Sequence, residues 1–378
     1  MVEATSETAT GTFEPTGKSG GFLRSSDGNY AIGRDDVFVP EQLCRTANLS
    51  GGEVVSGVVR TPARRSRKGP RELDCITSIG DAAVEDHLEV VAFEKLTPID
   101  PEKQMVFETP GGPMTMRVID LLTPIGFGQR GLIVAPPRTG KTILLQQMAQ
   151  AVAANYPDVY TMVLLVDERP EEVTDMRRKV HGEVIASSSD QDVESHIRLA
   201  RLVVAKAKRM VEAGRDVFIL LDSLTRLGRA FNASIRSGGR IMSGGLDINA
   251  LTEPKSIFGA ARNIEHGGSL TIVASALIET GSRMDEVIFN EFKGTGNMEI
   301  MLSREMANRR LWPAIDLNAS GTRKEELLLS PEMLSTSHSL RRSLIDRGPV
   351  QSMERLLEQL GRFESNAEFV LASPGGSR

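Results

Sequence analysis

One segment decides the fold: Gly131-Leu-Ile-Val-Ala-Pro-Pro-Arg-Thr-Gly-Lys-Thr142 has the pattern of a buried strand, a phosphate-binding loop and the start of a helix. Gly140 lets the backbone wrap closely round a phosphate, and the N–H groups of the following helix point at the anion. Lys141 is expected to neutralise the β- and γ-phosphate oxygens, and the Thr142 hydroxyl is expected to bind Mg²⁺. The segment from Ile143 to Ala153 is apolar at helical spacing. The sequence therefore predicts a nucleoside triphosphate site.

Two further strand-like runs end in carboxylates. The run Asp216-Val-Phe-Ile-Leu-Leu-Asp-Ser223 delivers Asp222, and the run Tyr160-Thr-Met-Val-Leu-Leu-Val-Asp-Glu168 delivers Glu168. The carboxyl ends of parallel strands meet at one edge of a sheet, so these acids are expected near the phosphate loop. Asp222 is the predicted support for Mg²⁺, and Glu168 is the predicted base that orients the attacking water. An acid at a strand end is common by itself, but the set together with Lys141 fits phosphoryl transfer.

Length and composition place the chain among soluble proteins of two or three domains, because it has 378 residues, of which 40% are hydrophobic and 25% charged. No apolar run approaches membrane-spanning length, and the two cysteines, Cys44 and Cys75, lack a C-x-x-C spacing. We therefore expect a cytoplasmic protein without a membrane partner. The net charge of −5 means that any binding of nucleic acid depends on a local basic patch.

Such a patch is the run Arg60-Thr-Pro-Ala-Arg-Arg-Ser-Arg-Lys-Gly-Pro-Arg71, which has six basic residues and no acid. It lies among short strand-like segments separated by turn residues, a pattern typical of a small OB/cold-shock-like β-barrel. A barrel with a basic loop and surface aromatics is a candidate binder of single strands. The alternative is that the aromatic rings belong to the barrel core and the basic run is only a solvated loop. The predicted contacts are the rings of Phe22 and Phe38 and the cations of Arg24, Arg45, Arg64 and Arg65.

Seven segments, in order along the chain from about Gly20 to the C-terminal helices, together resemble the bacterial transcription termination factor Rho family. The blocks around Asp167 and Arg323 are highly specific, whereas the phosphate loop alone would indicate only the wider superfamily. The seven segments are Gly21–Arg24, Asp35–Val39, Gly131–Thr142, Asp167–Thr174, Leu221–Arg226, Glu291–Asn297 and Ser320–Leu327.

The resemblance implies an α/β protein in which a RecA-like P-loop motor domain, built on a mostly parallel sheet, follows the barrel. It implies a homohexameric ring that hydrolyses ATP with Mg²⁺ as cofactor and moves along single-stranded RNA. The implied activity is transcription termination, in which the moving ring dissociates the RNA polymerase elongation complex. The expected boundaries are a disordered leader at 1–16, the barrel at 17–80, a connector at 81–116 and the motor with its C-terminal helices at 117–378.

The resemblance also implies roles in the ATP site. Arg323 resembles an arginine finger that reaches across a subunit interface, and Arg310 resembles a second interfacial sensor, both acting with Glu168 and Lys141 in catalysis. Trp312 resembles the family's aromatic residue that packs on adenine, although a core position would explain a tryptophan equally well. The implied ATP contacts are Gly126, Phe127, Gly128, Gln129, Arg130, Gly131, Arg138, Thr139, Gly140, Lys141, Thr142, Ile143, Arg169, Asp222 and Trp312, of which Thr142 and Asp222 hold the metal.

A path for RNA is implied by two glycine-rich loops, Ser237–Gly245 and Thr280–Asp285, which are similar to the family's pore loops. Without the family match, both would be interpreted as mobile surface loops. In these loops Arg240 and Arg283 are expected to hold the RNA backbone, and Ile241 is expected to insert as an apolar lever.

The barrel departs from the family pattern at two positions. This chain has Gly20 where the family has a second aromatic residue, and the aromatic of the later barrel strand is absent near Leu73. Each missing base–aromatic stack removes about 1–3 kcal/mol of binding. The resemblance still implies an RNA contact for Asp36. We therefore expect RNA loading to depend more than usual on the basic loop.

The main alternative is a different hexameric RecA-like ATPase, such as a subunit of a rotary ATP synthase or of a secretion ATPase, which also joins a β-barrel to this type of domain. Those proteins carry a glycine-rich phosphate loop where this chain has Ala135-Pro-Pro-Arg-Thr139. A second alternative is an RNA-binding protein with a degenerate ATP site. That alternative requires a missing catalytic residue, and the sequence has them all.

Overall fold

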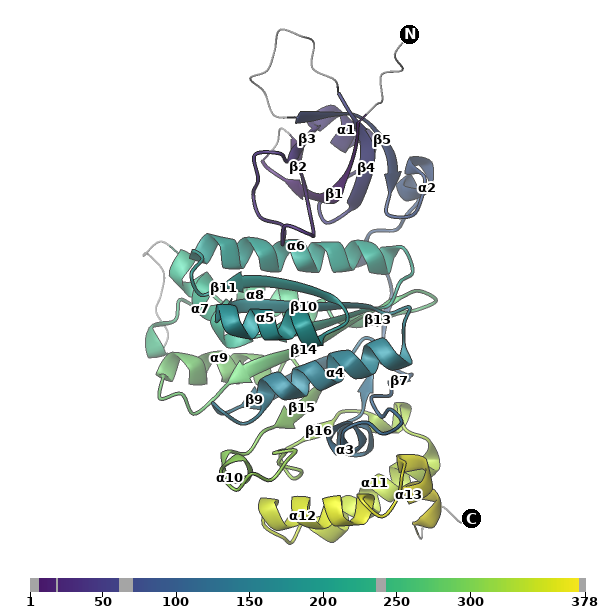
Figure 1. Cartoon of the computed structure of the whole chain (residues 1–378), viewed down its shortest axis with the longest axis vertical. Coiled ribbons are helices and arrows are strands. Elements are labelled where there is room, and N and C mark those ends of the chain that lie inside the picture. Colours follow the sequence, from purple (N-terminus) through teal and green to yellow (C-terminus); the bar gives the residue numbers. More distant parts are fainter. Residues whose placement is uncertain (1–6, 18–19, 61–70, 236–242, 374–378) are drawn as a thin grey trace. The chain divides into compact units, whose positions relative to one another are not determined.

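The computed structural model describes residues 7–17, 20–60, 71–235 and 243–373 (Figure 1). The chain forms two compact units. The first, called the barrel unit here, comprises residues 1–96 together with 198–215. The second, called the sheet unit, comprises residues 97–197 and 216–378. The long helix α6 (Val193–Glu212) therefore begins in the sheet unit and ends in the barrel unit.

The barrel unit contains a closed barrel of five strands in the order β1-β2-β3-β5-β4. Alternation of apolar and polar residues gives each strand an inner face, and seven buried apolar side chains from these faces form the barrel core. Short helices α1 (Glu41–Thr46) and α2 (Val84–Leu88) and the turn η1 (Phe93–Lys95) complete the unit. The strands are β1 (Thr8–Pro15), β2 (Gly20–Arg24), β3 (Val37–Pro40), β4 (Val54–Val59) and β5 (Arg71–Ile79).

The prediction of a disordered leader through Thr16 is wrong for Thr8–Pro15, which form β1. This strand pairs antiparallel with β2 and with β4, so it closes the barrel. Its sequence, TATGTFEP, has a single large apolar residue, Phe13, which is 2% exposed in the barrel core. Threonine favours extended backbone, but its hydroxyl is polar, so this strand lacks the alternation of apolar and polar residues that predicts a strand.

The sheet unit is built on a mostly parallel sheet in the order β11-β10-β12-β14-β9-β15-β16, as the α/β prediction requires. Its central strands are apolar on both faces because helices cover both: α4 and α5 lie on the side facing the viewer in Figure 1, and α7, α8 and α9 on the other. The strands are β6 (Pro98–Ile99), β9 (Arg130–Ala135), β10 (Tyr160–Glu168), β11 (Glu183–Ser188), β12 (Val217–Asp222), β13 (Arg262–Ile264), β14 (Ser269–Leu277), β15 (Met298–Met301) and β16 (Gly321–Thr322).

A separate two-stranded sheet pairs β7 (Gln104–Met105) with β8 (Ile125–Gly126). Among the described residues, no helix is both long enough and apolar enough to cross a membrane. The helices of the sheet unit are α3 (Met114–Leu122), α4 (Lys141–Asn155), α5 (Pro170–Lys179), α7 (Leu224–Ser234), η2 (Ser243–Gly245), α8 (Thr252–Gly259), α9 (Arg283–Lys293), α10 (Arg304–Asn308), η3 (Glu325–Leu327), α11 (Pro331–Leu344), α12 (Pro349–Leu360) and α13 (Asn366–Ala372).

The predicted connector at 81–116 is not a separate segment. Residues up to 96 belong to the barrel unit, whereas residues from 97 onward belong to the sheet unit. The predicted start of the motor at residue 117 would cut helix α3 after its third residue. This helix is amphipathic and packs with α4 and α11, so the sheet unit needs it for its core.

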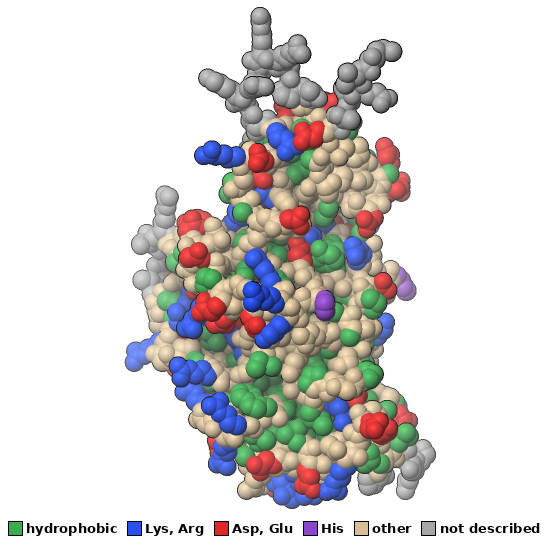
Figure 2. Space-filling view, in the orientation of Figure 1, with side chains coloured by type: hydrophobic (Ala, Val, Ile, Leu, Met, Phe, Trp, Pro, Cys, Tyr) green, Lys and Arg blue, Asp and Glu red, His purple; other side chains and the backbone are tan. Residues whose placement is uncertain are grey.

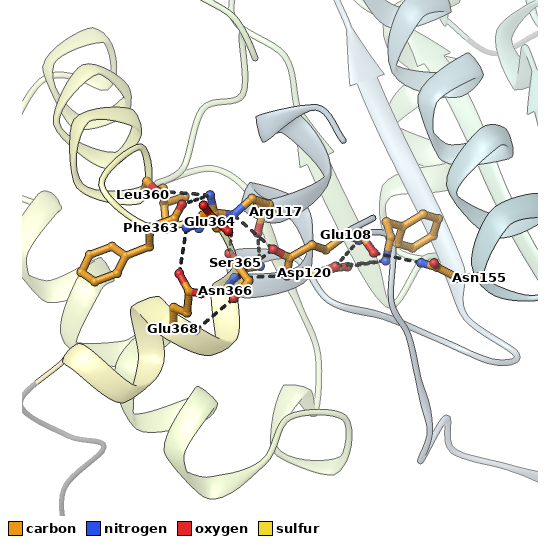
Figure 3. Close-up of polar contacts among 11 residues, drawn as sticks. Glu108, Arg117, Asp120, Asn155, Leu360, Phe363, Glu364, Ser365, Asn366 and Glu368 are labelled. Atoms are coloured by element: carbon orange, nitrogen blue, oxygen red, sulfur yellow. Dashed lines mark hydrogen bonds and ion pairs between the residues drawn. The ribbon is translucent and has the colours of Figure 1, made fainter. Parts of the chain in front are cut away.

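Arg117 of α3 anchors the C-terminal helices (Figure 3). Its side chain is 6% exposed, and its guanidinium donates to the carbonyls of Leu360 (3.2 Å) and Phe363 (2.7 Å) and to Oδ1 of Asn366 (3.2 Å). The first two carbonyls are at and just beyond the C-terminal end of α12, where a cation is favourable. Arg117 therefore caps α12 and fixes the turn into α13.

Two carboxylates complete this buried polar network (Figure 3). Glu108 accepts a hydrogen bond from the backbone N–H of Asn366 (2.9 Å), and Asp120 accepts from the N–H groups of Phe107 (2.9 Å) and Glu108 (2.7 Å). Burial raises the pKa of Asp120 to about 7, against the effect of these two backbone donors. The network joins the 107–108 segment, α3 and the α12–α13 turn into one body.

Candidate nucleotide and nucleic-acid sites

The phosphate loop connects the end of β9 to the start of α4. Thr139 is 2% exposed, and its hydroxyl donates to the carbonyl of Pro136 (2.7 Å), which closes the loop on itself. Arg138 and Gly140 have φ angles of 66° and 85°. Within the described residues no side chain caps the first turn of α4, so its N–H groups remain open to an anion.

Three side chains predicted for the catalytic centre meet beside this loop. The Nζ atom of Lys141 lies 2.5 Å from Oδ1 of Asp222 and 3.5 Å from Oε1 of Glu168. Asp222 also accepts a hydrogen bond from the hydroxyl of Ser275 on the neighbouring strand (2.7 Å). Burial opposes the charge of Lys141, but Asp222 and Glu168 outweigh burial and raise the pKa of the ammonium group. The two carboxylates hold Lys141 where a phosphate is expected.

Glu168 is the most unusual carboxylate of the site. It is 2% exposed, and neither of its oxygens accepts a hydrogen bond from the described part of the chain. Burial, followed by the charge of Asp222, raises the pKa of Glu168 to about 7, although Lys141 and Arg226 act in the opposite direction. A buried carboxylate with unused lone pairs and a pKa near neutrality is suited to accept a proton from water.

The sequence interpretation missed Arg226 as a site residue. Its Nη2 atom lies 3.4 Å from Oε2 of Glu168, and its Nη1 atom lies 4.0 Å from Oδ2 of Asp167. Arg226 is four residues beyond Asp222 and lies in the first turn of α7, whose N-cap is Ser223. Its position just after an acid-ending strand was the available signal, because the following helix starts at the same edge of the sheet.

An apolar pocket of about 140 Å³ adjoins the phosphate loop. Trp312 forms one wall and is 44% exposed, so the alternative of a core position for this tryptophan is wrong. A Cβ atom on Gly140 would lie 2.7 Å from the Trp312 ring, which shows how closely the ring approaches the loop. Thr115 of α3 and Ile143 line other parts of the pocket. Apolar side chains also gather on the surface below α4 (Figure 2). This combination suits a flat heteroaromatic base.

Three other predicted residues lie at this edge of the sheet. Arg169 is exposed at the N-cap of α5, directly after Glu168. Arg310 is exposed, has a φ angle of 60° and lies two residues before Trp312. Thr142 is half-buried in the first turn of α4. All three remain candidates for contact with a nucleotide.

Arg323 lies at the opposite edge of the sheet. It follows β16, and its backbone N–H donates to the carbonyl of Asn297 (2.9 Å), just before β15. With Arg130, Asn297 and Lys324, among others, Arg323 lines a pocket of about 210 Å³. Strand β9 starts at Arg130 and ends at Ala135, so about 15–20 Å of strand separates this pocket from the phosphate loop. Arg323 therefore cannot reach a nucleotide on its own chain's phosphate loop.

The prediction that the segment from Gly126 to Gly131 contacts ATP is wrong for the chain's own site, because this segment lies at the same distant edge. Its polar groups are used in the fold. The N–H of Gly128 donates to the Thr271 hydroxyl (2.8 Å), and Gln129 Nε2 donates to Asn297 Oδ1 (2.8 Å). The full set predicted here was Gly126, Phe127, Gly128, Gln129, Arg130 and Gly131.

The aromatic pair of the barrel lies on its outer face. Phe22 and Phe38 are half-buried and opposite each other on β2 and β3, with ring centroids 5.3 Å apart at 63°. The barrel core is made by other residues, so the alternative that both rings are core residues is wrong. The pair forms a surface on which a base can stack.

The two predicted cations of the barrel that the structure describes, Arg24 and Arg45, are already paired. Arg24, a predicted RNA contact, is 4% exposed and forms ion pairs with Glu14 (2.5 Å) and Asp36. Arg45 is exposed and pairs with Glu41 (2.5 Å), one turn earlier on α1. Arg283 is exposed as the first residue of α9. The predicted contacts Arg64, Arg65, Arg240 and Ile241 lie outside the described residues.

The two missing aromatics have different structural settings. Gly20 has a φ angle of 119°, and a Cβ atom there would lie 2.2 Å from the carbonyl oxygen of Val39, so the backbone of this chain admits only glycine at that position. Leu73 is fully buried in the barrel core. The interpretation of Leu73 as a lost stacking position is therefore wrong, because its side chain points inward.

Comparison with known families separates the same two parts of the chain. Residues 9–80 match the RNA-binding domain of the Rho termination factor. Residues 115–322 match the nucleotide-binding domain of the ATP synthase alpha/beta family. The first match begins inside β1 and the second inside α3, in agreement with the barrel and the sheet as separate folds.

Solved structures support the fold over most of the chain at low identity. A prototypical ATPase from a bacterial type III secretion system superposes with a TM-score of 0.60 at 21% identity. The matched region covers 82% of this chain and 89% of the ATPase chain. The assembled ATPase EscN of the enteropathogenic E. coli type III secretion system gives a TM-score of 0.57 at 21% identity over 74% of this chain and 64% of its own. These similarities establish the fold and no more.

Curated relatives match far more closely. Transcription termination factor Rho of Cereibacter sphaeroides is 51% identical over 352 residues, which cover 92% of this chain and 83% of the relative. Transcription termination factor Rho of Escherichia coli strain K12 is 50% identical over 354 residues, which cover 92% of this chain and 84% of the relative. With a phosphate loop, its acids and a barrel that carries an aromatic pair all in place, this chain belongs to the transcription termination factor Rho family.

Proposed function

We propose that this protein is an ATP-driven RNA translocase that binds nascent single-stranded RNA through its barrel and terminates transcription by dissociating the RNA polymerase elongation complex in the cytoplasm. The chain is an ATP-hydrolysing P-loop enzyme with a Rho-type RNA-binding domain. The observation that carries the proposal is the meeting of Lys141, Asp222 and the unsatisfied carboxylate of Glu168 beside the phosphate loop.

The arrangement supports hydrolysis in three steps. An incoming triphosphate takes the place of the carboxylates around Lys141, because its oxygens carry more charge than Asp222 or Glu168. The open N–H groups at the start of α4 receive the phosphate oxygens. Glu168, no longer paired with Lys141, orients a water molecule and accepts its proton as the water oxygen bonds to the γ-phosphorus. The bond from that phosphorus to the β–γ bridging oxygen breaks, and ADP leaves with the electron pair.

Residues that fit Mg²⁺ are present at the same place. The Thr142 hydroxyl and the Asp222 carboxylate are the hard oxygen donors that this ion prefers, and Mg²⁺ beside a phosphate needs only one or two protein ligands. When bound, the ion neutralises charge on the transferring phosphoryl group. The structure offers no competing site of three or more His, Cys, Asp or Glu side chains within the part of the chain that it describes.

A ring assembly accounts for the position of Arg323. An arginine finger supplied by a neighbouring subunit stabilises the charge of the transition state. Arg323 is exposed at the edge opposite to its own phosphate loop, so a head-to-tail arrangement of subunits is needed to bring it to an ATP site. A closed head-to-tail arrangement is a ring, and we propose a homohexamer.

The deciding experiment is an ATPase assay of the purified protein with and without RNA. We expect slow turnover alone and severalfold faster turnover with single-stranded RNA, but not with duplex DNA of the same length. The Lys141→Ala variant should be inactive in both conditions, since the phosphate charge is no longer matched. ATP turnover that ignores RNA would contradict the RNA motor and favour an ATPase of the secretion type.

The pH dependence of turnover tests the role of Glu168. Because burial and Asp222 raise the pKa of Glu168 to about 7, and the base must be ionised to act, kcat/KM for ATP should rise with pH and level off above about 7. Below that value we expect a fall of about tenfold per pH unit. Binding of a non-hydrolysable ATP analogue, measured over the same pH range, is the control for titration of the nucleotide. A flat profile would show that another group is the base.

A further inference from the structure

Four charged side chains form a chain of ion pairs within the barrel unit. Arg24 on β2 pairs with Asp36 and, through Nε, with Oε2 of Glu14 on β1 at 2.5 Å. Nη1 of Arg198 on α6 lies 3.0 Å from both oxygens of the same Glu14 carboxylate. The exposed fractions of these side chains are 4% for Arg24, 12% for Glu14 and Asp36, and 22% for Arg198. Two positive and two negative charges cancel in this cluster.

The cluster lies directly beside the aromatic pair. Glu14 is the cross-strand partner of Phe22, which is in turn the partner of Phe38. The guanidinium carbon of Arg24 lies 5.0 Å from the centre of the Phe22 ring. A base stacked on this ring brings its own polar edge and its phosphate within reach of Arg24.

Nε and Nη1 of Arg24 can bind RNA only if they give up Glu14 or Asp36, the carboxylates that they now hold. Removing one partner of a buried ion pair costs about 3–5 kcal/mol, because the remaining charge is left uncompensated. Among the described residues, Asp36 would be left with a hydrogen bond from the backbone N–H of Gly33 (2.7 Å). Glu14 is different, since Arg198 already donates to both of its oxygens. Transfer of Arg24 from Glu14 to RNA therefore costs less free energy than transfer of Arg24 from Asp36 to RNA.

We propose that Glu14 accepts the hydrogen bond of Arg24 when no RNA is bound, and that Arg24 transfers from Glu14 to an oxygen acceptor on RNA when RNA binds. Arg198 then keeps the charge of Glu14 neutralised. This inference rests on the proposed function, in which the barrel binds RNA. It makes Glu14 a determinant of RNA affinity and Arg198 a positioning residue that does not touch RNA. The acceptor is an oxygen of a phosphate or of a base edge, which share the chemistry that a guanidinium recognises.

Arg198 is held in place without Arg24. Its Nη2 atom donates to the carbonyl of Tyr30 (2.7 Å), and the Tyr30 hydroxyl accepts from Nζ of Lys206, also on α6 (2.8 Å). The turn before β4 approaches the helix so closely that a Cβ atom on Gly52 would lie 2.3 Å from the backbone of Ala205. This part of α6 is therefore fixed to the barrel, and Arg198 stays beside Glu14 when Arg24 moves.

The test measures the affinity of the full-length protein for labelled oligo(C) and oligo(A) RNA as a function of salt. Glu14→Gln should bind RNA more tightly, because Arg24 has lost a competitor. Its salt slope should steepen by about 0.7 if the acceptor is a phosphate; an unchanged slope with a stronger preference between the two RNAs identifies a base edge. Arg198→Met should weaken binding by about tenfold, because transfer of Arg24 then leaves the charge of Glu14 without a cationic partner.

The double variant Glu14→Gln/Arg198→Met is the decisive arm. Without the charge of Glu14, Arg198 has nothing to neutralise, so the double variant should bind RNA as tightly as Glu14→Gln. This tight binding would also show that the barrel folds without Arg198. Lys208→Met, on the same helix and paired with the exposed Glu94, is the matched control and should bind like the natural protein.

Two results would overturn the inference while leaving the proposed function intact: a Glu14→Gln variant that binds no more tightly than the natural protein, or an equal loss from Arg198→Met with and without Glu14→Gln. The second result would mean that Arg198 acts through the stability of the barrel. Failure of the natural protein itself to bind either RNA would instead contradict the proposed function.

Discussion

Glu168→Gln is expected to lower RNA-stimulated ATP turnover by about 10²–10⁴-fold and to leave ATP binding intact. The amide keeps the shape of the side chain but cannot accept the proton of the attacking water, and that proton transfer is worth about this factor. Lys141 keeps its closer partner, since Nζ lies 2.5 Å from Asp222 and 3.5 Å from Glu168. Phosphate release and the binding of a fluorescent ATP analogue measure the two properties separately.

The matched control for this variant is Glu171→Gln. Glu171 is an exposed carboxylate in the first turn of α5, three residues beyond Glu168, and should be replaceable with little effect on turnover. Lys141→Ala should differ from Glu168→Gln by losing ATP binding as well, because it removes the charge that meets the phosphates. Normal turnover in Glu168→Gln would assign the base to another group.

The candidate catalytic centre was predictable because each of its residues follows a short segment with a recognisable sequence pattern. A strand, a loop and a helix carry Lys141, and two other apolar strands end at Asp222 and Glu168. Strands of this kind align in parallel, so their last residues meet without any further information. The pairing of β10 with β12 and of β14 with β9 does this here.

The partners of Arg24 were not predictable in the same way. Asp36 is 12 residues from Arg24, and the contact of Glu14 with Arg198 spans 184 residues. A sequence pattern shows that an arginine lies near aromatic residues, but it does not show that two carboxylates already hold it and that a distant helix contacts one of them. Strand β1 was missed for a related reason, since its pairing with β4 joins Thr8 to Val58.

The edge of the sheet that carries Arg323 shows a third limit. The family resemblance placed Arg323 at the nucleotide of a neighbouring subunit, but it placed the segment from Gly126 to Gly131 beside the nucleotide without distinguishing a chain's own site from its neighbour's. The direction of β9 makes the distinction, because Arg130 starts the strand and the phosphate loop follows its end. The hydrogen bonds of Gly128 and Gln129 show that part of this segment is structural.

Arg323→Ala is expected to lower turnover by about 10³–10⁵-fold, the range found for loss of an arginine finger, and to do so through the neighbouring subunit. Because Arg323 cannot reach its own phosphate loop, we expect each active site to combine Lys141 of one chain with Arg323 of the next. Rings mixed from Lys141→Ala and Arg323→Ala chains should therefore regain hydrolysis that neither variant has alone. Single-turnover hydrolysis of bound ATP is the appropriate measurement, because it does not require all sites of a ring to hydrolyse ATP one after another.

The control mixture combines Lys141→Ala chains with chains that carry both substitutions. It contains no intact phosphate loop, so it should stay inactive, whereas the first mixture contains interfaces at which an intact Lys141 faces an intact Arg323. Co-purification through a tag on one variant shows that the two kinds of chain share a ring. Mixed rings that form but stay inactive would refute sharing of the site between subunits, and normal turnover of Arg323→Ala alone would remove Arg323 from catalysis. Recovery in the first mixture only would make the distant edge of the sheet the second half of each ATP site.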